Sequence, residues 1–467
     1  MLVRKTKIVC SMGPSCTNPE TFKRMVEAGM NVARINFTHA TNIECESVLA
    51  MVREANQHDN NHIAIMYDTK GPDFRTGPME NGAIELETGR LISIVPEDVE
   101  GNVERFTVNY KEALGIINVG NIILIEDGMF KLEVVEKNGH TLICRILIGG
   151  TLCNRKGINV PGLDLAIPFL SEKDIEDIKY ACHHQGDFIA LSFVSNKEEV
   201  LSVRDIIVNE SSDMKIISKI ESISALKNID GIIDASDGIM VARGDLGVEV
   251  PLVDVPIIQK KLIKKCRDKG KFCIVATEML LSMTKNIRPT RAEVSDVANA
   301  VLDGTDAVML SNETTIGNYP VEAVKVLADT CERVEEHLDY THPTLPLDQK
   351  TTRRTIAYSA VLAANNMDAS AILASTLRGN SAMQVSTLRP KAVILAACTT
   401  EEAARSLAFN FGVYPCVVPI FNTTDEIIEI AKAKGREVLG LQKGDLVVIT
   451  GGFPQTKSTN FLKIEEI

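Results

Sequence analysis

A lysine and a glutamate lie two residues apart in the stretch Lys215–Ser222, which reads Lys-Ile-Ile-Ser-Lys-Ile-Glu-Ser. Side chains at positions i and i+2 of a β-strand share one face, so we expect Lys219 and Glu221 to point the same way at the end of a buried segment. Charged residues are seldom buried unless they are paired. The pattern therefore indicates a structural ion pair, a strand end that emerges into solvent, or two members of a functional site.

Polar side chains also follow several other apolar segments of the chain. Glu221 and Asp245 offer only oxygen donors, which suit Mg²⁺ or Mn²⁺ better than zinc. Lys219 and Arg34 supply positive charge suited to a phosphoryl group or a developing enolate. Gly244 lets the backbone approach a ligand closely, and its loop can present amides to an anion. The polar residues at segment ends are Arg34, Asn36, Asp68, Thr69, Ser192, Lys219, Glu221, Arg243, Asp245, Thr277, Glu278 and Ser311.

The segments that carry these residues are predicted to be strands of one sheet. Helical patterns lie between them, such as 19–29 and the capping box Thr290–Glu293 ahead of an apolar run. Strands that alternate with helices pair in parallel, and eight β/α units predict a TIM barrel. Such a barrel keeps its active site at the C-terminal ends of its strands, so polar residues at most of these ends favour one shared site. The expected strands are 5–11, 31–37, 62–69, 187–193, 215–221, 238–244, 271–278 and 306–313.

Two further regions break this alternation. Short alternating β patterns fill residues 71–167, where Lys137-Asn-Gly is a plausible hairpin turn, and they predict an all-β domain inserted after the third strand. Beyond the boundary signal His342–Pro346, apolar segments alternate with helices again, which predicts an α/β domain with an open sheet. The expected domains are the barrel at 1–70 and 169–342, the inserted domain at 71–168 and the third domain at 343–467, with strands near 371–374, 392–396 and 446–449.

The composition of the 467 residues is that of an ordinary globular protein, with 45% hydrophobic and 24% charged residues. A formal net charge of -12 argues against a nucleic-acid binder. No apolar run approaches transmembrane length, and the first residues show no signal-peptide pattern, so no membrane partner is expected. Eleven cysteines without a C-x-x-C pair suggest reduced thiols, and we therefore expect a cytoplasmic protein.

Six segments carry long sequence motifs: Val32–His39, Asp68–Pro72, Ile217–Glu221, Met240–Glu249, Pro289–Glu293 and Asp296–Ser311. These motifs resemble the signatures of pyruvate kinases, and the resemblance covers the whole chain in that family's domain order. The resemblance implies a homotetramer that transfers the phosphoryl group of phosphoenolpyruvate to ADP, giving pyruvate and ATP in the last step of glycolysis. It also implies that the inserted domain is a small β-barrel acting as a lid that excludes water.

The resemblance assigns roles to the residues of the barrel mouth. Glu221 and Asp245 would hold Mg²⁺. Lys219 would stabilise the transferring phosphoryl group and the enolate, and Arg34 would contact the phosphoryl group, since this chemistry depends on positioning and charge neutralisation. The remaining implied roles are substrate-carboxylate binding by Gly244, Asp245 and Thr277, and a place on the side of enolate protonation for Thr277 and Ser311.

The resemblance further implies a monovalent-cation site and contacts to the nucleotide. Asp73 stands where a glutamate marks K⁺-dependent members and a lysine marks independent ones, so an acid there favours K⁺ dependence. The residues that match the K⁺ site are Asn36, Thr38, Asp68 and Thr69. Those that match nucleotide contacts are Arg75, Lys156, Asn36 and His39.

The third domain leaves two alternatives open. The loop Ser375–Ser381 resembles the one with which some family members bind regulatory sugar phosphates, and small residues there can cradle phosphate. However, Asn380 stands where some members have lysine, and Lys457–Asn460 shortens another family motif. The domain is therefore either an allosteric effector domain or a packing domain. The candidate effector residues are Ser375, Thr376, Gly379 and Ser381.

Two rival functions are weighed against this assignment. A catalytically silent relative that senses a metabolite would be expected to lack Lys219, Glu221 or Asp245, and all three are present. Another Mg²⁺-dependent barrel enzyme of the phosphoenolpyruvate/pyruvate type would share the paired carboxylates but lack the inserted and third domains.

Overall fold

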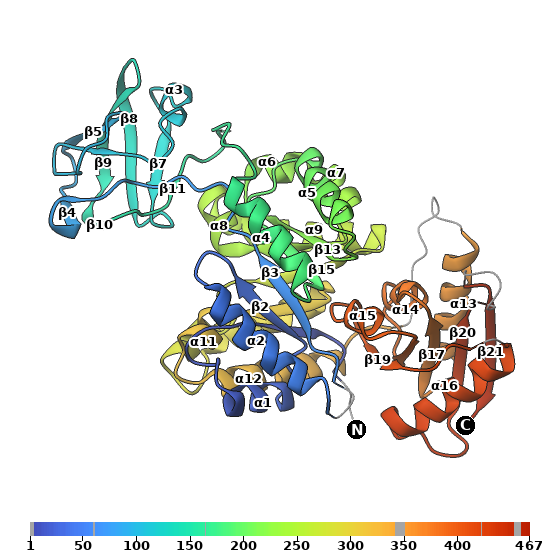
Figure 1. The fold of residues 1–467 in the computed structure, drawn as a ribbon. Helices are drawn as coiled ribbons and strands as arrows, with labels where there is room; N and C mark the ends of the chain where they lie inside the picture. Colours follow the sequence, from blue (N-terminus) through green and yellow to red (C-terminus); the bar gives the residue numbers. More distant parts are fainter. Residues whose placement is uncertain (1–3, 59–60, 164, 341–350, 422, 453–458) are drawn as a thin grey trace.

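The computed structural model describes residues 4–58, 61–163, 165–340, 351–421, 423–452 and 459–467. Eight parallel strands close into a barrel in the order β1-β16-β15-β14-β13-β12-β3-β2, and helices surround it (Figure 1). The predicted TIM barrel is thus confirmed. Its strands are β1 (Lys7–Ser11), β2 (Val32–Asn36), β3 (Ala64–Asp68), β12 (Phe188–Leu191), β13 (Lys215–Ile220), β14 (Gly238–Ala242), β15 (Phe272–Ala276) and β16 (Ala307–Leu310).

The barrel strands are apolar on both faces. Val9 and Met240 belong to the cluster that fills the barrel, whereas their neighbours Ile8 and Ile239 pack beneath the outer helices. A parallel sheet covered on both sides excludes water from both, which explains the nearly continuous apolar runs. Most of the predicted segments end later than the observed strands, because their last polar residues leave the ladder. Glu221, for example, follows β13 instead of ending it.

The outer helices start at residues that satisfy free backbone N–H groups. The predicted capping box of Thr290 and Glu293 starts α10 (Arg291–Asp303), and Ser171 with Asp174 starts α4 (Glu172–His183) in the same way. The other helices of this part are α1 (Pro19–Glu27), α2 (Asn42–Ala55), α5 (Lys197–Asn209), α6 (Ile223–Lys227), α7 (Ile229–Ala235), α8 (Arg243–Glu249), α9 (Val255–Lys269), α11 (Asn312–Thr315) and α12 (Pro320–Glu335).

The β-rich inserted domain is confirmed and stands over one end of the barrel (Figure 1). Its ladders form a six-stranded sheet, β11-β7-β8-β9-β5-β6, and a two-stranded sheet, β10-β4, rather than one closed small barrel, because only isolated bridges join their edges. The predicted hairpin turn lies at Gly139, with φ of 62°. The elements are β4 (Ala83–Leu86), β5 (Leu91–Val95), β6 (Arg105–Thr107), α3 (Ala113–Ile116), β7 (Ile122–Ile125), β8 (Phe130–Asn138), β9 (Thr141–Ile148), β10 (Gly150–Cys153) and β11 (Ile158–Asn159).

The third domain has the predicted open sheet, with strand order β19-β18-β17-β20-β21. The strands β19 and β21 were not among the predicted strands, and Pro415 is tolerated in β19 because β19 is an edge strand. The predicted boundary His342–Pro346 lies outside the described residues. The elements are α13 (Thr352–Asn366), β17 (Ala371–Thr376), α14 (Asn380–Ser386), β18 (Val393–Cys398), α15 (Glu401–Arg405), β19 (Val413–Val417), α16 (Thr424–Leu439), β20 (Leu446–Gly451) and β21 (Phe461–Glu466).

The third domain packs against the N-terminal end of the barrel, away from the inserted domain (Figure 1). Phe409 enters the barrel floor, where its ring centroid lies 4.6 Å from that of Phe188 and 5.0 Å from that of Phe272. Beside it, the Arg405 guanidinium lies 2.9 Å from the buried carboxylate of Asp187. The opposite end of the barrel is thereby left open. In the described part of the chain, no helix combines the length and apolarity needed to cross a membrane.

Candidate active site

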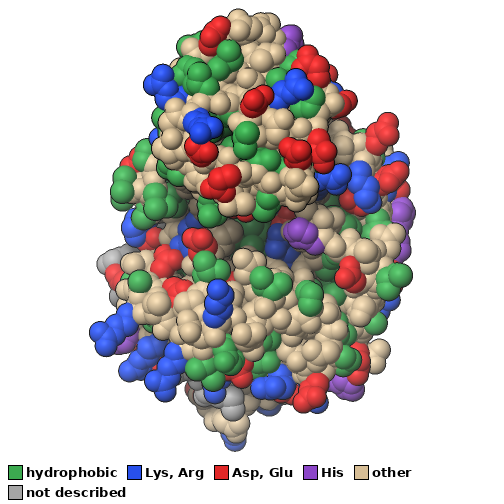
Figure 2. All heavy atoms as spheres, turned by 90° about the vertical axis from the view of Figure 1, so that its left-hand side faces the viewer, with side chains coloured by type: hydrophobic (Ala, Val, Ile, Leu, Met, Phe, Trp, Pro, Cys, Tyr) green, Lys and Arg blue, Asp and Glu red, His purple; other side chains and the backbone are tan. Residues whose placement is uncertain are grey.

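A cleft of about 760 Å³ lies at the C-terminal ends of the barrel strands, between the barrel and the inserted domain. Figure 2 shows the molecule from this side, hollowed between an upper and a lower part, with basic side chains deep in the hollow. The barrel contributes Arg34, Lys219 and Asp245 to its wall, and the inserted domain contributes Arg75 and Lys156. The structure thus brings together residues that were predicted separately at strand ends.

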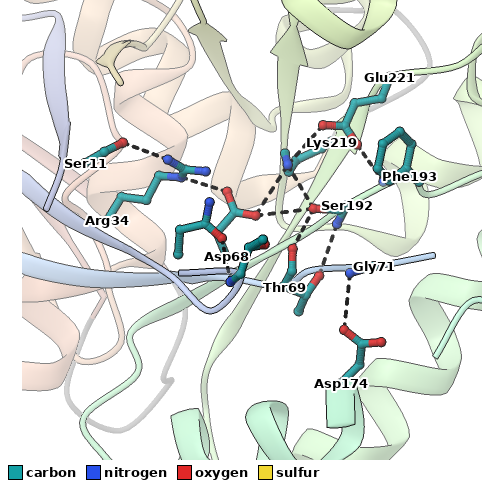
Figure 3. Close-up of polar contacts among 12 residues, drawn as sticks. Ser11, Arg34, Asp68, Thr69, Gly71, Asp174, Ser192, Phe193, Lys219 and Glu221 are labelled. Atoms are coloured by element: carbon teal, nitrogen blue, oxygen red, sulfur yellow. Dashed lines mark hydrogen bonds and ion pairs between the residues drawn. The ribbon is translucent and has the colours of Figure 1, made fainter. Parts of the chain in front are cut away.

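Lys219, near the end of β13, lies at the centre of a network of hydrogen bonds and ion pairs at the wall of the cleft (Figure 3). Its Nζ donates to Ser192 Oγ over 2.8 Å and lies 3.0 Å from Glu221 Oε1 and 3.4 Å from Asp68 Oδ1. The predicted proximity of Lys219 and Glu221 is therefore observed. Only 12% of the Lys219 side chain is exposed, and Lys219 lines the cleft.

Arg34, on β2, shares Asp68 with Lys219 (Figure 3). Its Nε donates to Asp68 Oδ2 over 2.7 Å, and its Nη1 donates to Ser11 Oγ over 2.8 Å. Asp68 therefore binds one cation through each oxygen and holds both at the same edge of the cleft.

These contacts shift the pKa values of the groups in opposite directions. Burial acts to lower the pKa of Lys219, but Asp68 and Glu221 outweigh it and raise the pKa above its usual value. Burial acts to raise the pKa of Asp68, but Arg34 and Lys219 lower it overall. Lys219 and Asp68 are thus fixed as charged groups near neutral pH.

Glu221 behaves differently. Burial raises its pKa to about 7, an effect that Lys219 opposes and the nearby Asp245 reinforces. The residue is only 1% exposed, and its Oε1 makes no hydrogen bond of acceptable geometry with the described residues despite the nearby ammonium. A buried carboxylate oxygen without a hydrogen bond, beside a second carboxylate, fits a hard divalent cation such as Mg²⁺ or Mn²⁺.

The backbone after β12 orients Glu221. Phe193 has φ of 55°, in the left-handed region, and its N–H donates to Glu221 Oε2 over 2.6 Å. One carboxylate oxygen is therefore held by an amide, while the buried Oε1 lies beside the Lys219 ammonium. Phe193 carries no polar side chain, so sequence analysis could not identify this contact.

The residues expected to hold K⁺ lie on the neighbouring strand ends of β2 and β3. Asn36 pairs with Asp68 in the ladder, and Asn36 Oδ1 accepts the Thr38 N–H over 3.0 Å. Thr69 Oγ1 accepts the Ser192 N–H over 3.2 Å. All four side chains line the cleft, and their oxygen donors are of the type that a monovalent cation requires.

Gly244, Thr277 and Ser311 lie at the next strand ends around the barrel. The Gly244 N–H donates to Thr277 Oγ1 over 2.9 Å, beside Asp245. The Ser311 N–H is held by its neighbour Glu313, whose Oε2 lies 2.8 Å away. The structure therefore joins Gly244 and Thr277 directly, and it leaves Ser311 one strand further on.

The cations expected to contact the nucleotide are paired with acids. Arg75 Nε lies 2.5 Å from Asp73 Oδ1, and the other oxygen of Asp73 lies 2.9 Å from Lys70 Nζ. Lys156 Nζ lies 2.5 Å from Glu126 Oε1. Arg75 and Lys156 both line the main cleft, and a neighbouring cavity of about 500 Å³ is lined by Arg75 and His39.

The candidate effector loop follows β17 in the third domain, far from this cleft. Ser375, Thr376 and Ser381 are buried, and Ser381 Oγ lies 2.6 Å from Thr459 Oγ1. Gly379 has φ of 81° and begins the turn into α14. These hydroxyl groups are thus largely directed into the domain. Of the motif Lys457–Asn460, only the last two residues are described.

Two positioning contacts were missed by sequence analysis. Ser11 binds Arg34, and its place at the end of the first predicted strand was an available signal. Asp174, which starts α4, also accepts the Gly71 N–H over 3.2 Å at the entry to the inserted domain (Figure 3). No local pattern predicts that second contact, because the two residues are distant in sequence.

Comparisons with known proteins give a consistent result. The family model for the pyruvate kinase barrel domain matches residues 3–324, and the model for the pyruvate kinase alpha/beta domain matches residues 354–465. The pyruvate kinase of Geobacillus stearothermophilus is 45% identical over 472 residues, which cover 99% of this chain and 80% of that protein. That of Clostridium acetobutylicum is 40% identical over 472 residues, which cover 100% of both. A crystal structure of a pyruvate kinase from Cryptosporidium parvum, 38% identical, matches with a TM-score of 0.94 and covers 99% of this chain and 96% of that one.

Proposed function

The chain belongs to the pyruvate kinase family of phosphotransferases, and on that premise we propose that it transfers the phosphoryl group of phosphoenolpyruvate to ADP, forming pyruvate and ATP. The observation that carries this proposal is the Lys219 ammonium, held between Asp68 and Glu221 at the cleft. Because its pKa is raised, it stays charged throughout the physiological range. A fixed cation of this kind suits a reaction that depends on charge neutralisation.

The proposed reaction has two steps. An oxygen of the ADP β-phosphate attacks the phosphorus, the bond from phosphorus to the enol oxygen breaks, and the enolate leaves with that electron pair. We assign Arg34 and Lys219 to the charge of the moving phosphoryl group, and Lys219 also to the enolate oxygen. The methylene carbon then takes a proton to give pyruvate, on the side where Thr277 and Ser311 are proposed to act.

The substrate carboxylate is assigned to the amides of Gly244 and Asp245 with the Thr277 hydroxyl. There it would replace the present bonds from the Gly244 N–H to Thr277 Oγ1 and from that hydroxyl to the Ala276 carbonyl. Glu221 and Asp245 are the proposed ligands of Mg²⁺ or Mn²⁺, supported by the buried Glu221 Oε1 described above. When bound, the divalent cation would neutralise negative charge on the substrate oxygens. Asn36, Thr38, Asp68 and Thr69 are the proposed K⁺ ligands, and the acid at Asp73 favours K⁺ dependence.

Arg75 and Lys156 are the proposed phosphate contacts of the nucleotide, together with Asn36 and His39. Their present partners Asp73 and Glu126 would hold the two cations ready until a nucleotide phosphate competes for them. The inserted domain would then close over the cleft as a lid and exclude water.

We further propose a cytoplasmic homo-oligomer, a tetramer as in the family, with the three domains bounded as predicted from the sequence. All eleven cysteines are free thiols, which suits a reducing compartment. Leu252 and Val253 are 75% and 82% exposed, and Ile257 lies close by in sequence. Large exposed apolar side chains together favour a contact with a second copy of the chain. The loop Ser375–Ser381 is left without an assigned effector, because its hydroxyl groups are buried in the domain.

The test is pyruvate formation from phosphoenolpyruvate and ADP with Mg²⁺, measured with K⁺ and then with a non-activating cation in its place. We expect turnover that requires K⁺. Turnover that is indifferent to K⁺ would preserve the reaction and reject the assignment of Asp73. Folded protein without turnover in either buffer would favour a catalytically silent relative.

A further inference from the structure

Thr277 has an unusual backbone conformation. Its φ is 71°, and that of Glu278 is 54°, so two consecutive residues with side chains occupy the left-handed region after β15. A β-branched residue is rarely found there, because its side chain crowds the backbone. Such strain persists only where the surroundings impose it, and it is concentrated at functional sites. The turn therefore needs neighbouring groups that hold its backbone in place, and we call these groups the clamp.

Arg243 holds the turn through hydrogen bonds to its backbone carbonyl groups. Its Nε donates to the Ala276 carbonyl over 3.3 Å, and its Nη2 donates to the Thr277 carbonyl over 2.6 Å. The same Nη2 lies 3.0 Å from Met279 Sδ. Only 13% of the Arg243 side chain is exposed. One planar guanidinium therefore fixes the direction of two successive carbonyl groups, which a single-point ammonium could not do.

Asp296, on α10, orients that guanidinium. Its Oδ2 accepts from Arg243 Nη1 over 2.5 Å. Arg243 is followed directly by Gly244, whose N–H donates to Thr277 Oγ1. The dipeptide thus holds Thr277 twice, by its carbonyl and by its hydroxyl.

We propose that Arg243 and Asp296 are positioning residues that hold Thr277 in the left-handed conformation. They thereby keep its hydroxyl, which now donates to the Ala276 carbonyl over 2.6 Å, beside the Gly244 amide at the proposed site of the substrate carboxylate. The proposal rests on the proposed function for the identity of that substrate. Neither residue touches the substrate. Both act through Thr277, so their loss should weaken the carboxylate site without affecting the nucleotide contacts on the other side of the cleft.

The kinetic test compares Arg243→Lys and Asp296→Asn with Arg204→Lys. Arg204 is a matched control, because it makes a similar pair with Asp237 at 2.8 Å and a bond to a backbone carbonyl, but at the other end of the strands. We expect the first two variants to lower kcat/KM for phosphoenolpyruvate by about 10- to 100-fold, the scale of a misplaced catalytic contact, with KM for ADP unchanged. Wild-type kinetics, or equal changes in both KM values, would overturn the proposal.

A stability test does not depend on activity. At positive φ glycine is favoured over alanine, so Thr277→Gly should melt about 2 °C above Thr277→Ala, while both lack the hydroxyl. In the Arg243→Lys background residue 277 can relax, and the difference should vanish. An equal difference in both backgrounds would refute the clamp. If wild-type protein lacks turnover, the proposed function fails, and this cycle still decides whether the clamp exists.

Discussion

The Lys219 ammonium is surrounded by groups that would be costly to bury singly. Asp68 pairs with both Lys219 and Arg34, Glu221 adds a second carboxylate beside Lys219, and Ser192 Oγ accepts one of the ammonium protons. Buried ion pairs of this kind add little net stability compared with apolar packing, although breaking one leaves an uncompensated charge. The network is therefore better explained by a function at the cleft than by stabilisation of the barrel.

Lys219→Met should remove this cation while retaining an apolar stem of similar length. We expect turnover to fall at least about 100-fold, because a preorganised charge at the reacting group is lost. Circular dichroism should show a retained fold. Lys227→Met, at the exposed last residue of α6, is the control and should keep wild-type turnover. A near-normal rate for Lys219→Met would contradict the role assigned to it.

The raised pKa of Glu221 predicts pH-dependent binding of Mg²⁺. The folded pKa of about 7 exceeds the ordinary value of 4.5, so the protonated carboxyl group contributes stability to the metal-free protein at low pH. This contribution is lost as the pH rises from 4.5 to 7, because the buried carboxylate must then ionise. A divalent cation binds the ionised form. The rise in Tm on adding Mg²⁺ should therefore be larger at pH 8 than at pH 6. Glu221→Gln should abolish the rise, and equal rises at both pH values would argue against this pKa.

At the scale of elements, two helices begin with the same capping box but have different surroundings. In α2, Glu44 lies at the surface and, among the described residues, accepts hydrogen bonds from Thr41 alone. In α4, Asp174 accepts from Ser171 and also from the Gly71 N–H, where the chain leaves the barrel for the inserted domain. The helix start thus also holds the hinge of the proposed lid.

Asp174→Ala and Glu44→Ala separate these two functions. Asp174→Ala should lower the free energy of unfolding by about 1–3 kcal/mol, because it leaves the buried Gly71 N–H without its acceptor. Glu44→Ala should lower it less, because Glu44 lies at the surface. Only Asp174→Ala should also change KM for ADP, because only it frees the hinge of the lid. Denaturant titration and steady-state kinetics measure the two effects. Identical kinetics for both variants would show that the Gly71 contact does not influence the lid.

At the scale of the molecule, the third domain closes the barrel floor. Phe409 stacks on Phe272 inside the barrel, and around it Lys215 Nζ donates to the Ser406 carbonyl over 2.7 Å. Arg405 adds the ion pair with Asp187. Barrel and third domain therefore share one apolar cluster, so we expect them to unfold together.

Phe409→Ala should leave a cavity at this floor and lower the free energy of unfolding by about 3–5 kcal/mol. Calorimetry should then resolve separate transitions for the barrel and the third domain. Phe106→Ala, at a fully buried position of the inserted domain, is the control and should leave the shared transition intact. A single cooperative transition in Phe409→Ala would mean that polar contacts alone couple the two domains.

Local sequence signals predicted the eight barrel strands, the inserted β domain and the α/β class of the third domain, because apolar periodicity and turn residues are local. It also located Lys219, Glu221 and Asp245, since polar residues at strand ends need no knowledge of distant partners. The folded structure was needed to show which oxygen contacts which cation, which groups hold Thr277 at positive φ, and that Phe409 fills the barrel floor. Those contacts join residues far apart in the chain, and their geometry depends on barrel closure and domain packing, which no local pattern encodes.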